Sequence, residues 1–167
     1  VAKCLKKHRV VNSSWDHDSI ILKDRVNIGM AVATSEGLFV PVIHEADTLE
    51  VSDIAKAIAR LTRNAHEGTL SVTEVQGATF TVNNTGALGS IIGKAIINYP
   101  QAAILNTEAI VKRPIVKDEE ILIRSMMNLC LTFDHRILDG SEASRFLSDV
   151  KKKLEMITLS IKKSQES

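Results

Sequence analysis

The sequence predicts an α/β (α+β) fold, a two-layer sandwich in which helices cover mainly one face of a mixed sheet. Three observations support this prediction. Two segments carry apolar residues at helical spacing, many others are apolar over strand lengths, and short polar turns separate neighbouring strand segments as in hairpins. Two good helices with many strands are typical of a sheet covered on one side.

The first helix is expected within residues 1–9, where Val1, Ala2 and Leu5 share one face, and the polar triplet 12–14 ends the pattern. Strands are expected next at 19–22, 26–34 and 38–43. The last two, separated by Glu36-Gly37, are predicted to form a hairpin of well-buried strands. Pro41 lacks an amide donor and is therefore expected at an edge or unpaired position.

The two clearest helical segments lie later in the chain. Apolar residues recur at helical spacing from Val51 to Ala65, and Gly68 follows the predicted end of that helix. A final helix carries a long apolar stripe made of Ala143, Phe146, Leu147, Val150, Leu154, Ile157 and Ile161. The lysines at 151–153 fall on another face, which we interpret as solvated.

Between these helices the sequence predicts a strand at 77–83 and then an irregular loop, because Gly86, Gly89 and Gly93 fall within eight residues. Further strands are expected at 101–107, 109–112, 121–124 and 126–133, with a charged turn at 118–120.

Composition and charge exclude several classes of protein. The chain has 167 residues with 21 Lys+Arg against 20 Asp+Glu, and a net charge of +1 argues against binding nucleic acid or an anionic membrane through bulk charge. Apolar residues make up 44% and charged residues 25%, which predicts one folded soluble domain. No apolar run approaches the ~20 residues that span a bilayer.

The cysteines and the first residues bear on compartment and domain boundaries. Cys4 follows a lysine and Cys130 lies in an apolar run, which predicts buried, reduced thiols in an intracellular protein rather than a disulfide. Residues 1–7 already have the pattern of a helix end, so we expect the sequence to begin inside a domain.

The most informative stretch is residues 131–140, Leu-Thr-Phe-Asp-His-Arg-Ile-Leu-Asp-Gly. A histidine leaves a predicted strand there, and an Asp-Gly pair precedes a predicted helix. An imidazole titrates near neutral pH and can accept and return a proton, so His135 is the general-base candidate. A structural explanation is also open: a hydrogen-bonded surface histidine, Asp139 as a helix cap and Gly140 as a turn residue.

Segment 134–140 resembles the signature of the acyltransferase component of 2-oxo acid dehydrogenase complexes, whose catalytic domain has a chloramphenicol acetyltransferase-like fold. Four upstream blocks agree in order and spacing, at 27–33, 37–43, 77–86 and 97–105. The resemblance extends to about Glu155 and implies an acyltransferase catalytic domain over residues 1–167. Such domains run to roughly 230 residues, so its first ~60 residues are expected to be missing, together with the lipoyl and peripheral subunit-binding domains.

The resemblance implies a role for each matching residue. His135 matches the histidine that deprotonates the thiol of coenzyme A. The resulting thiolate attacks the acyl thioester of dihydrolipoamide, and the histidine then returns the proton to the lipoyl sulfur. Asp139 matches the second signature residue, which holds the loop through an ion pair. Arg136, Gly140 and Gly86 are expected as structural support. The implied substrates are coenzyme A and a lipoyl group on an absent domain, with no metal.

One matching position departs from the family. In most members a serine in the block 79–86 donates a hydrogen bond to the tetrahedral oxyanion, and here Asn83 stands at that position. An asparagine amide can also donate to an oxyanion, so we expect retained function with altered geometry. The structural alternative is that Asn83 and Asn84 only shape the turn before Gly86, since asparagine favours turns.

The resemblance also implies a homotrimer in which His135 of one subunit faces the donor residue of its neighbour. Trimers of this family assemble into a larger hollow core, and the apolar stripe of the last helix is a candidate contact between them. Partner 2-oxo acid decarboxylase and dihydrolipoamide dehydrogenase components would bind through the absent domains. The implied location is the cytoplasm of a prokaryote or the mitochondrial matrix of a eukaryote. Residues 98–101 resemble bacterial branched-chain enzymes.

Two other functions stay open from the sequence. An acyltransferase of the same fold could use a small amine or hydroxyl acceptor without a lipoyl partner. A non-catalytic structural core subunit is favoured by the Asn83 departure and opposed by His135, Asp139 and Gly140. The glycine-rich loop lacks the spacing of a phosphate-binding loop, and the remaining histidines show no zinc-ligand spacing with the cysteines.

Overall fold

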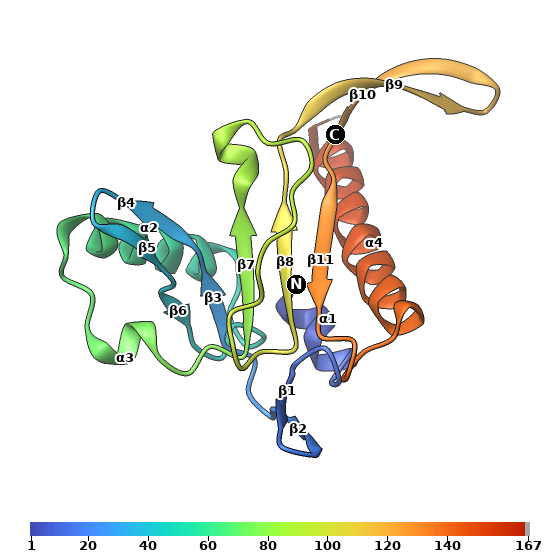
Figure 1. Cartoon of the computed structure of the whole chain (residues 1–167). Coiled ribbons are helices and arrows are strands. Elements are labelled where there is room, and N and C mark those ends of the chain that lie inside the picture. The colour runs from blue at the N-terminus through green and yellow to red at the C-terminus, as the bar shows by residue number, and fades with distance from the viewer. Residues whose placement is uncertain (166–167) are drawn as a thin grey trace.

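The computed structural model describes the backbone of residues 1–165 and the side chains of residues 1–156. Its centre is a five-stranded sheet with strand order β11-β8-β7-β3-β6 (Figure 1). The inner pairs β8–β7 and β7–β3 are parallel, whereas the outer pairs β11–β8 and β3–β6 are antiparallel. The predicted mixed sheet is therefore confirmed. Its strands span Ile28–Met30 (β3), Val42–Ile43 (β6), Phe80–Asn84 (β7), Ala103–Thr107 (β8) and Leu129–Phe133 (β11).

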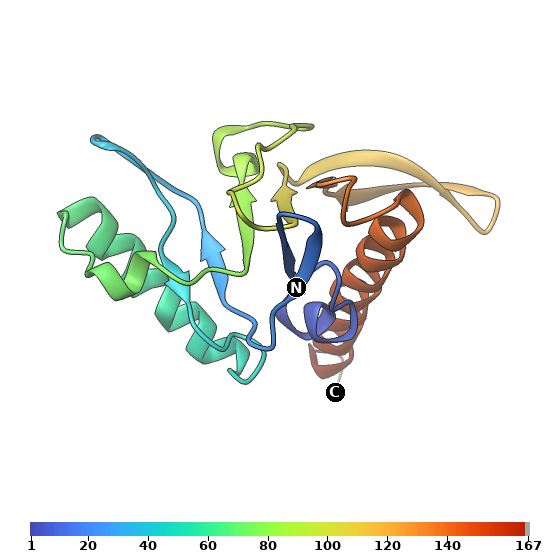
Figure 2. The same cartoon turned by 60° about the horizontal axis from the view of Figure 1, so that its bottom comes forward.

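Three two-stranded ribbons extend from this sheet, and Figure 2 shows the yellow β9–β10 ribbon reaching away from the rest of the molecule. The ribbons pair β1 with β2, β4 with β5 and β9 with β10; the strands span Ser13–Asp16 (β1), Ser19–Leu22 (β2), Val32–Thr34 (β4), Gly37–Phe39 (β5), Val111–Lys117 (β9) and Glu120–Met126 (β10).

The predicted hairpin of residues 26–43 forms as two successive pairs, β3–β6 inside the sheet and β4–β5 beyond it. Pro41 precedes β6, which is an edge strand, as predicted. The prediction that both strands are well buried is wrong for the outer pair, since Leu38 is 69% exposed. That pair has left the sheet, so Leu38 does not face the core, although Val32 of β4 remains buried at 7% exposure.

Strand β1 is an element that the sequence prediction missed. It begins at Ser13, inside the polar triplet 12–14 that ends the helical pattern in the sequence, and Ser13 and Ser14 are both buried. The backbone around them satisfies their polar groups: Ser13 Oγ donates to the carbonyl of Val10, and Ser14 forms an antiparallel bridge with Gln101. Polarity is therefore no sign of exposure at this position.

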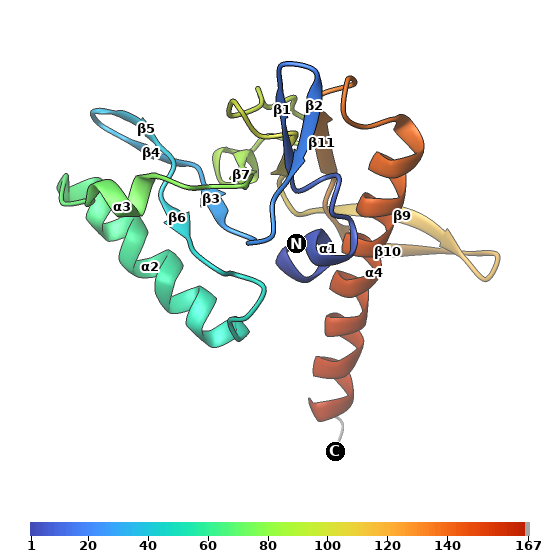
Figure 3. The same ribbon diagram turned by 90° about the horizontal axis from the view of Figure 1, so that it is seen from below.

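The helices cover one face of the sheet, as Figure 3 shows for α1 (Ala2–Lys7), α2 (Val51–Glu67) and α4 (Gly140–Gln165). This arrangement confirms the predicted two-layer fold. Helix α2 ends at Gly68, whose φ of 67° is the left-handed cap that the sequence predicted. Two short helical elements complete the fold, α3 (Val72–Val75) and the 3₁₀ turn η1 (Thr85–Leu88). No helix of residues 1–165 is long and apolar enough to cross a membrane.

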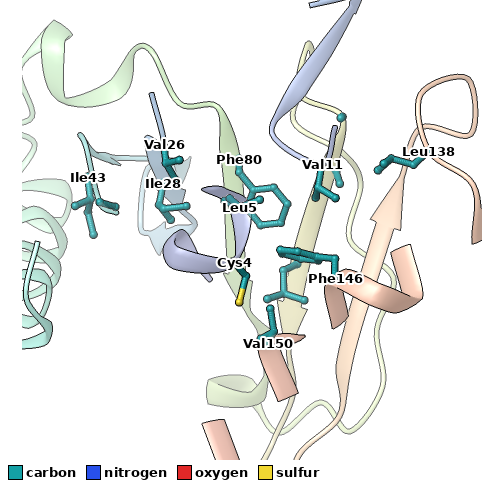
Figure 4. Packing of buried hydrophobic residues seen from close by; sticks show 14 of the residues in the cluster. Cys4, Leu5, Val11, Val26, Ile28, Ile43, Phe80, Leu138, Phe146 and Val150 are labelled. Atoms are coloured by element: carbon teal, nitrogen blue, oxygen red, sulfur yellow. The ribbon is translucent and has the colours of Figure 1, made fainter. Parts of the chain in front are cut away.

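The core lies between the sheet and α1, α2 and α4 (Figure 4). At its centre the rings of Phe80 and Phe146 meet edge to face, with 5.7 Å between centroids, and Leu5 of α1 is fully buried with them. Cys4 is 1% exposed and Cys130 is only half-buried, and both thiols are free. The apolar stripe of α4 is buried at Ala143, Phe146 and Val150, whereas the side chains of Ile157 and Ile161 lie outside the described residues.

Asp149 joins α4 to α1. Its carboxylate accepts hydrogen bonds from Lys7 Nζ at 2.7 Å and His8 Nε2 at 2.9 Å, which lower the pKa of Asp149 to about 2. A depressed carboxyl pKa stabilises the fold above about pH 4, and this contribution is lost as the pH falls toward 2. We expect Asp149→Asn to lower Tm by a few degrees at pH 7, and the difference from the wild type to shrink between pH 4 and pH 2.

Circular dichroism melts over a pH series test this prediction. Asp24→Asn is the matched control, because Asp24 also pairs with a cation, Arg9, but its side chain is 91% exposed. An equal Tm for Asp149→Asn and the wild type at pH 7 would contradict the assignment.

Candidate active site

His135 is the second residue after β11, in the turn that leads to α4. Its side chain is exposed, and its ring lies 5.5 Å from that of Phe133. No hydrogen bond joins the imidazole to any of the described residues. The alternative of a hydrogen-bonded surface histidine therefore finds no support among residues 1–156, and the exposed imidazole can be reached by a substrate.

The turn that carries His135 is held by its two neighbours in sequence. Arg136 Nε donates to Asp134 Oδ1 at 3.0 Å and Arg136 Nη2 to Asp134 Oδ2 at 2.6 Å, a bidentate pair. These hydrogen bonds lower the pKa of Asp134. The guanidinium also lies 5.2 Å from the ring centre of Trp15, in β1. Arg136 thus contacts both Asp134 in the turn and Trp15 in the β1–β2 ribbon.

Asp139 caps α4. Its Oδ1 accepts the backbone N–H groups of Ser141 and Glu142, each at 2.9 Å, and Glu142 Oε2 accepts the backbone N–H of Asp139 in return. The bonds from the Glu142 backbone and the Ser141 side chain lower the pKa of Asp139. In the part of the chain whose side chains are described, no cation lies within ion-pair distance of this carboxylate. The expected ion pair is not formed there, and Asp139 and Gly140 act as the cap and first residue of the helix.

This cap gives a prediction for Asp139. We expect Asp139→Ala to lower Tm by a few degrees, because the first turn of α4 loses its acceptor, whereas Asp139→Asn keeps an equally good cap and changes Tm by less than one degree. Thermal unfolding of the two variants beside the wild type is the measurement. Equal losses of Tm in both variants would show that the carboxylate charge, not the cap, is what matters.

Asn83 lies in β7, one residue before the end of the strand. Its side chain is half-buried and has no hydrogen-bond partner among residues 1–156, while its backbone carbonyl accepts Thr107 Oγ1 at 3.3 Å. The neighbouring Asn84 differs, because its Oδ1 accepts the backbone N–H of Ala87 and caps η1. The turn-shaping alternative is therefore confirmed for Asn84, and the amide of Asn83 takes no part in it.

Gly86 lets η1 approach the end of β8. A Cβ at this position would overlap the backbone of Glu108 and Ala109, so only glycine fits. Gly86 therefore joins η1 closely to the residues that follow β8. It also fixes the backbone three residues after Asn83.

A single chain holds the two candidate catalytic residues far apart. Asn83, Asn106 and Cys130 form one row across β7, β8 and β11. His135 comes five residues after Cys130, which places it about 16 Å farther along the antiparallel β11 at ~3.3 Å per residue. In Figure 1 β7 ends at the top of the sheet and β11 at the bottom. Both residues can therefore act on one substrate only if they come from different copies.

A buried polar cluster beside Asn83 was not predicted. Glu108 is 2% exposed and accepts Thr85 Oγ1 at 2.8 Å and an amide hydrogen of Asn106. Burial alone would raise the pKa of Glu108, but hydrogen bonds from Thr85, Ser90, Asn106 and the Gly93 backbone together lower it. Polar residues at 106 and 108, beside the apolar segment 102–105, were the available signal. The described residues contain no group of three His, Cys, Asp or Glu that could hold a metal.

A family model described as 2-oxoacid dehydrogenases acyltransferase (catalytic domain) matches residues 1–161. The chain belongs to this family. The lipoamide acyltransferase component of the branched-chain alpha-keto acid dehydrogenase complex of Bacillus subtilis is 52% identical over 158 residues, 94% of this chain and 37% of that relative. This acyltransferase domain thus spans less than two fifths of that protein's length.

Solved structures agree with this assignment. A probable dihydrolipoamide acetyltransferase from Listeria monocytogenes has a TM-score of 0.92 at 47% identity, over 93% of this chain and 67% of that one. The Azotobacter vinelandii dihydrolipoamide acetyltransferase, studied for the role of a serine, a histidine and an asparagine in its catalytic mechanism, has a TM-score of 0.86 at 34% identity, over 89% and 62%.

Two further structures bear on fold and assembly. Chloramphenicol acetyltransferase, at 16% identity, superposes with a TM-score of 0.53 over 90% of this acyltransferase domain and 72% of its own chain, and confirms the expected fold. The cubic core of a pyruvate dehydrogenase multienzyme complex has a TM-score of 0.85 at 34% identity, over 88% and 61%. That relative assembles into a multimeric core.

Proposed function

We propose that this domain is a dihydrolipoamide acyltransferase that moves an acyl group between dihydrolipoamide and coenzyme A. The observation that carries the proposal is the exposed imidazole of His135, which makes no hydrogen bond to any described residue and lies in the turn that the Arg136–Asp134 pair orders, within the family signature. A thiol with a pKa near 8.5 is mostly protonated at neutral pH, so little of the nucleophilic thiolate is present in water. A base in this position removes the thiol proton and forms the thiolate.

In the proposed reaction His135 takes the proton of the coenzyme A thiol, and the thiolate sulfur forms a bond to the carbonyl carbon of the acyl-dihydrolipoamide thioester. The carbonyl oxygen becomes an oxyanion. Collapse of this tetrahedral intermediate breaks the bond to the lipoyl sulfur, and the lipoyl thiolate takes the proton back from His135. Acyl-coenzyme A and dihydrolipoamide are the products, and His135 ends as it began.

Asn83 is proposed to donate an amide N–H to the oxyanion. Its side chain has no hydrogen-bond partner among residues 1–156, and oxyanion holes can use asparagine. Sequence separations support the assignment: in the Azotobacter enzyme the histidine lies 52 residues after the serine and four before the asparagine, the separations at which Asn83 and Asp139 stand from His135 here.

The site is proposed to form between copies of the chain in a homotrimer, as the distance from Asn83 to His135 requires. Exposed apolar residues on the β9–β10 ribbon support self-association, since Val116, Ile121 and Ile123 are 76%, 77% and 68% exposed. A two-stranded ribbon with an uncovered apolar face is marginally stable alone. We further propose that trimers build a hollow core, in the bacterial cytoplasm or the mitochondrial matrix, and meet decarboxylase and dihydrolipoamide dehydrogenase components through other domains.

Acyl transfer by the assembled full-length enzyme tests this function. The measurement follows thioester formation on free dihydrolipoamide from acetyl- or isobutyryl-coenzyme A, and we expect transfer with a preference for the branched acyl group, because the Bacillus subtilis relative is named for a branched-chain complex. Transfer only to a small amine or hydroxyl acceptor would favour the related acyltransferase function. An assembled enzyme that transfers to none of these acceptors would be a structural subunit.

A further inference from the structure

Asn106, in β8, has a buried carbonyl oxygen without a partner. The residue is 1% exposed, and its amide nitrogen donates to Thr85 Oγ1 at 2.8 Å and to Glu108 Oε1. Its Oδ1 accepts no hydrogen bond from any of the described residues. A buried acceptor of this kind is destabilising, so its presence calls for a physical explanation, and a role in catalysis is one.

The orientation of the Asn106 amide is fixed by Glu108. A carboxylate only accepts hydrogen bonds, and four donors keep Glu108 ionised by lowering its pKa. The nitrogen of Asn106 must therefore face Glu108 and its oxygen must face away, because the flipped amide would set two acceptors against each other.

The neighbour of Asn106 on the next strand is Asn83. The two residues are paired in the parallel β7–β8 register, and paired residues point to the same face of a sheet on strands about 4.8 Å apart. Stacked asparagines at this spacing form amide ladders, in which the N–H of one side chain meets the oxygen of the next. Among the residues whose side chains are described, the two N–H groups of Asn83 and the oxygen of Asn106 have no other partner.

We propose that Asn106 positions Asn83: Asn106 Oδ1 accepts one amide N–H of Asn83 when substrate binds and directs the other N–H at the oxyanion. The inference rests on the proposed function. It also accounts for the departure from serine. An amide is a rigid plane that turns about its last side-chain torsion, so a second partner is what fixes the direction of its N–H groups, whereas the single hydrogen of a serine hydroxyl rotates to suit its acceptor. Catalytic hydrogen bonds are often long in a free enzyme and tighten in the complex.

The surroundings of Asn106 are rigid enough for this role. Glu108 also binds Ser90 and the Gly93 backbone, and the backbone of Ala109 donates to the carbonyl of Ser90 at 2.7 Å. With the close packing of Gly86, these contacts tie residues 85–93 to the end of β8. The free oxygen of Asn106 is thus fixed by the fold rather than by the substrate.

A double-mutant cycle in the assembled full-length enzyme tests the inference, with free dihydrolipoamide and an acyl-coenzyme A as substrates. In the enzyme with the wild-type Asn83 we expect Asn106→Leu to lower kcat about tenfold while KM stays within twofold. The ground state does not use the amide N–H that Asn83 donates to the oxyanion, so KM should change little. In the Asn83→Ser enzyme we expect the same change at residue 106 to lower kcat less than twofold. Equal losses in both backgrounds would overturn the positioning role.

Thr85→Val is the matched control. It removes two other hydrogen bonds of the same cluster, from Asn106 to Thr85 and from Thr85 to Glu108, but leaves the Asn106–Glu108 bond and Asn106 Oδ1 in place, so its effect on kcat should not depend on residue 83. If Asn106→Leu gives no folded assembly, Asn106→Ser serves in the cycle, since its hydroxyl is too short to reach Asn83. A large loss of kcat in Asn83→Ala together with no loss in the residue 106 variants would overturn this inference alone. If kcat falls neither in Asn83→Ala nor in the residue 106 variants, the proposed function of Asn83 itself is contradicted.

Discussion

His135→Ala is expected to lower kcat about a thousandfold, with KM for both substrates within a few fold of the wild type. General-base catalysis contributes roughly 10²- to 10⁴-fold, and substrate binding does not need the imidazole. The variant should also gain rate as the pH rises toward 8.5, since the coenzyme A thiol then ionises without help. Steady-state kinetics over a pH series measure both effects.

His17→Ala is the control for that experiment. His17 is another exposed histidine, in the turn of the β1–β2 ribbon, and its removal should leave kcat unchanged. A His135→Ala enzyme within tenfold of the wild type at neutral pH would remove His135 from the mechanism. So would a rate that does not respond to pH in the expected direction.

The second large effect is expected at Asn83. Asn83→Ala should lower kcat about a hundredfold or more with Tm nearly unchanged, because one oxyanion donor is worth 10²- to 10³-fold and the side chain makes no other hydrogen bond within the described residues. Asn83→Ser, the residue of most family members, should restore kcat to within about tenfold of the wild type. Asn84→Ala should instead lower Tm and leave kcat alone, since Asn84 caps η1.

Kinetic assays and thermal melts of these three variants separate the two asparagines. Near-wild-type turnover in Asn83→Ala would contradict its role at the oxyanion. A loss of turnover in Asn84→Ala equal to that in Asn83→Ala would mean that turn geometry, not donation, governs the rate.

The parts of the fold that follow apolar periodicity could be predicted from the sequence. Helix α2 and its glycine cap, and the buried strand β8, formed where the spacing placed them. Strand β1 could not be predicted, because its polar Ser13 and Ser14 are buried by backbone contacts from distant residues. The predicted burial of Leu38 was wrong for the opposite reason. Leu38 is apolar, but its ribbon leaves the sheet, and this depends on tertiary structure.

The candidate site also has parts that local sequence predicts and parts that depend on tertiary structure. The signature turn places His135, Arg136 and Asp139 by local sequence, and their local contacts are within a few residues of each other. The relation of Asn83 to Asn106 depends on the register of two strands far apart in the chain, and no local pattern reveals it. The distance from Asn83 to His135 follows from that same register.

The central claim is that each active site combines His135 of one copy with Asn83 of another, and mixing two inactive variants tests it most directly. His135→Ala and Asn83→Ala chains, assembled together in equal amounts, should regain roughly a quarter of wild-type turnover, because one interface in four pairs an intact His135 with an intact Asn83 in a symmetric ring. Assembly of either variant alone stays inactive. A mixed assembly of normal size with no more activity than the separate variants would contradict the shared site.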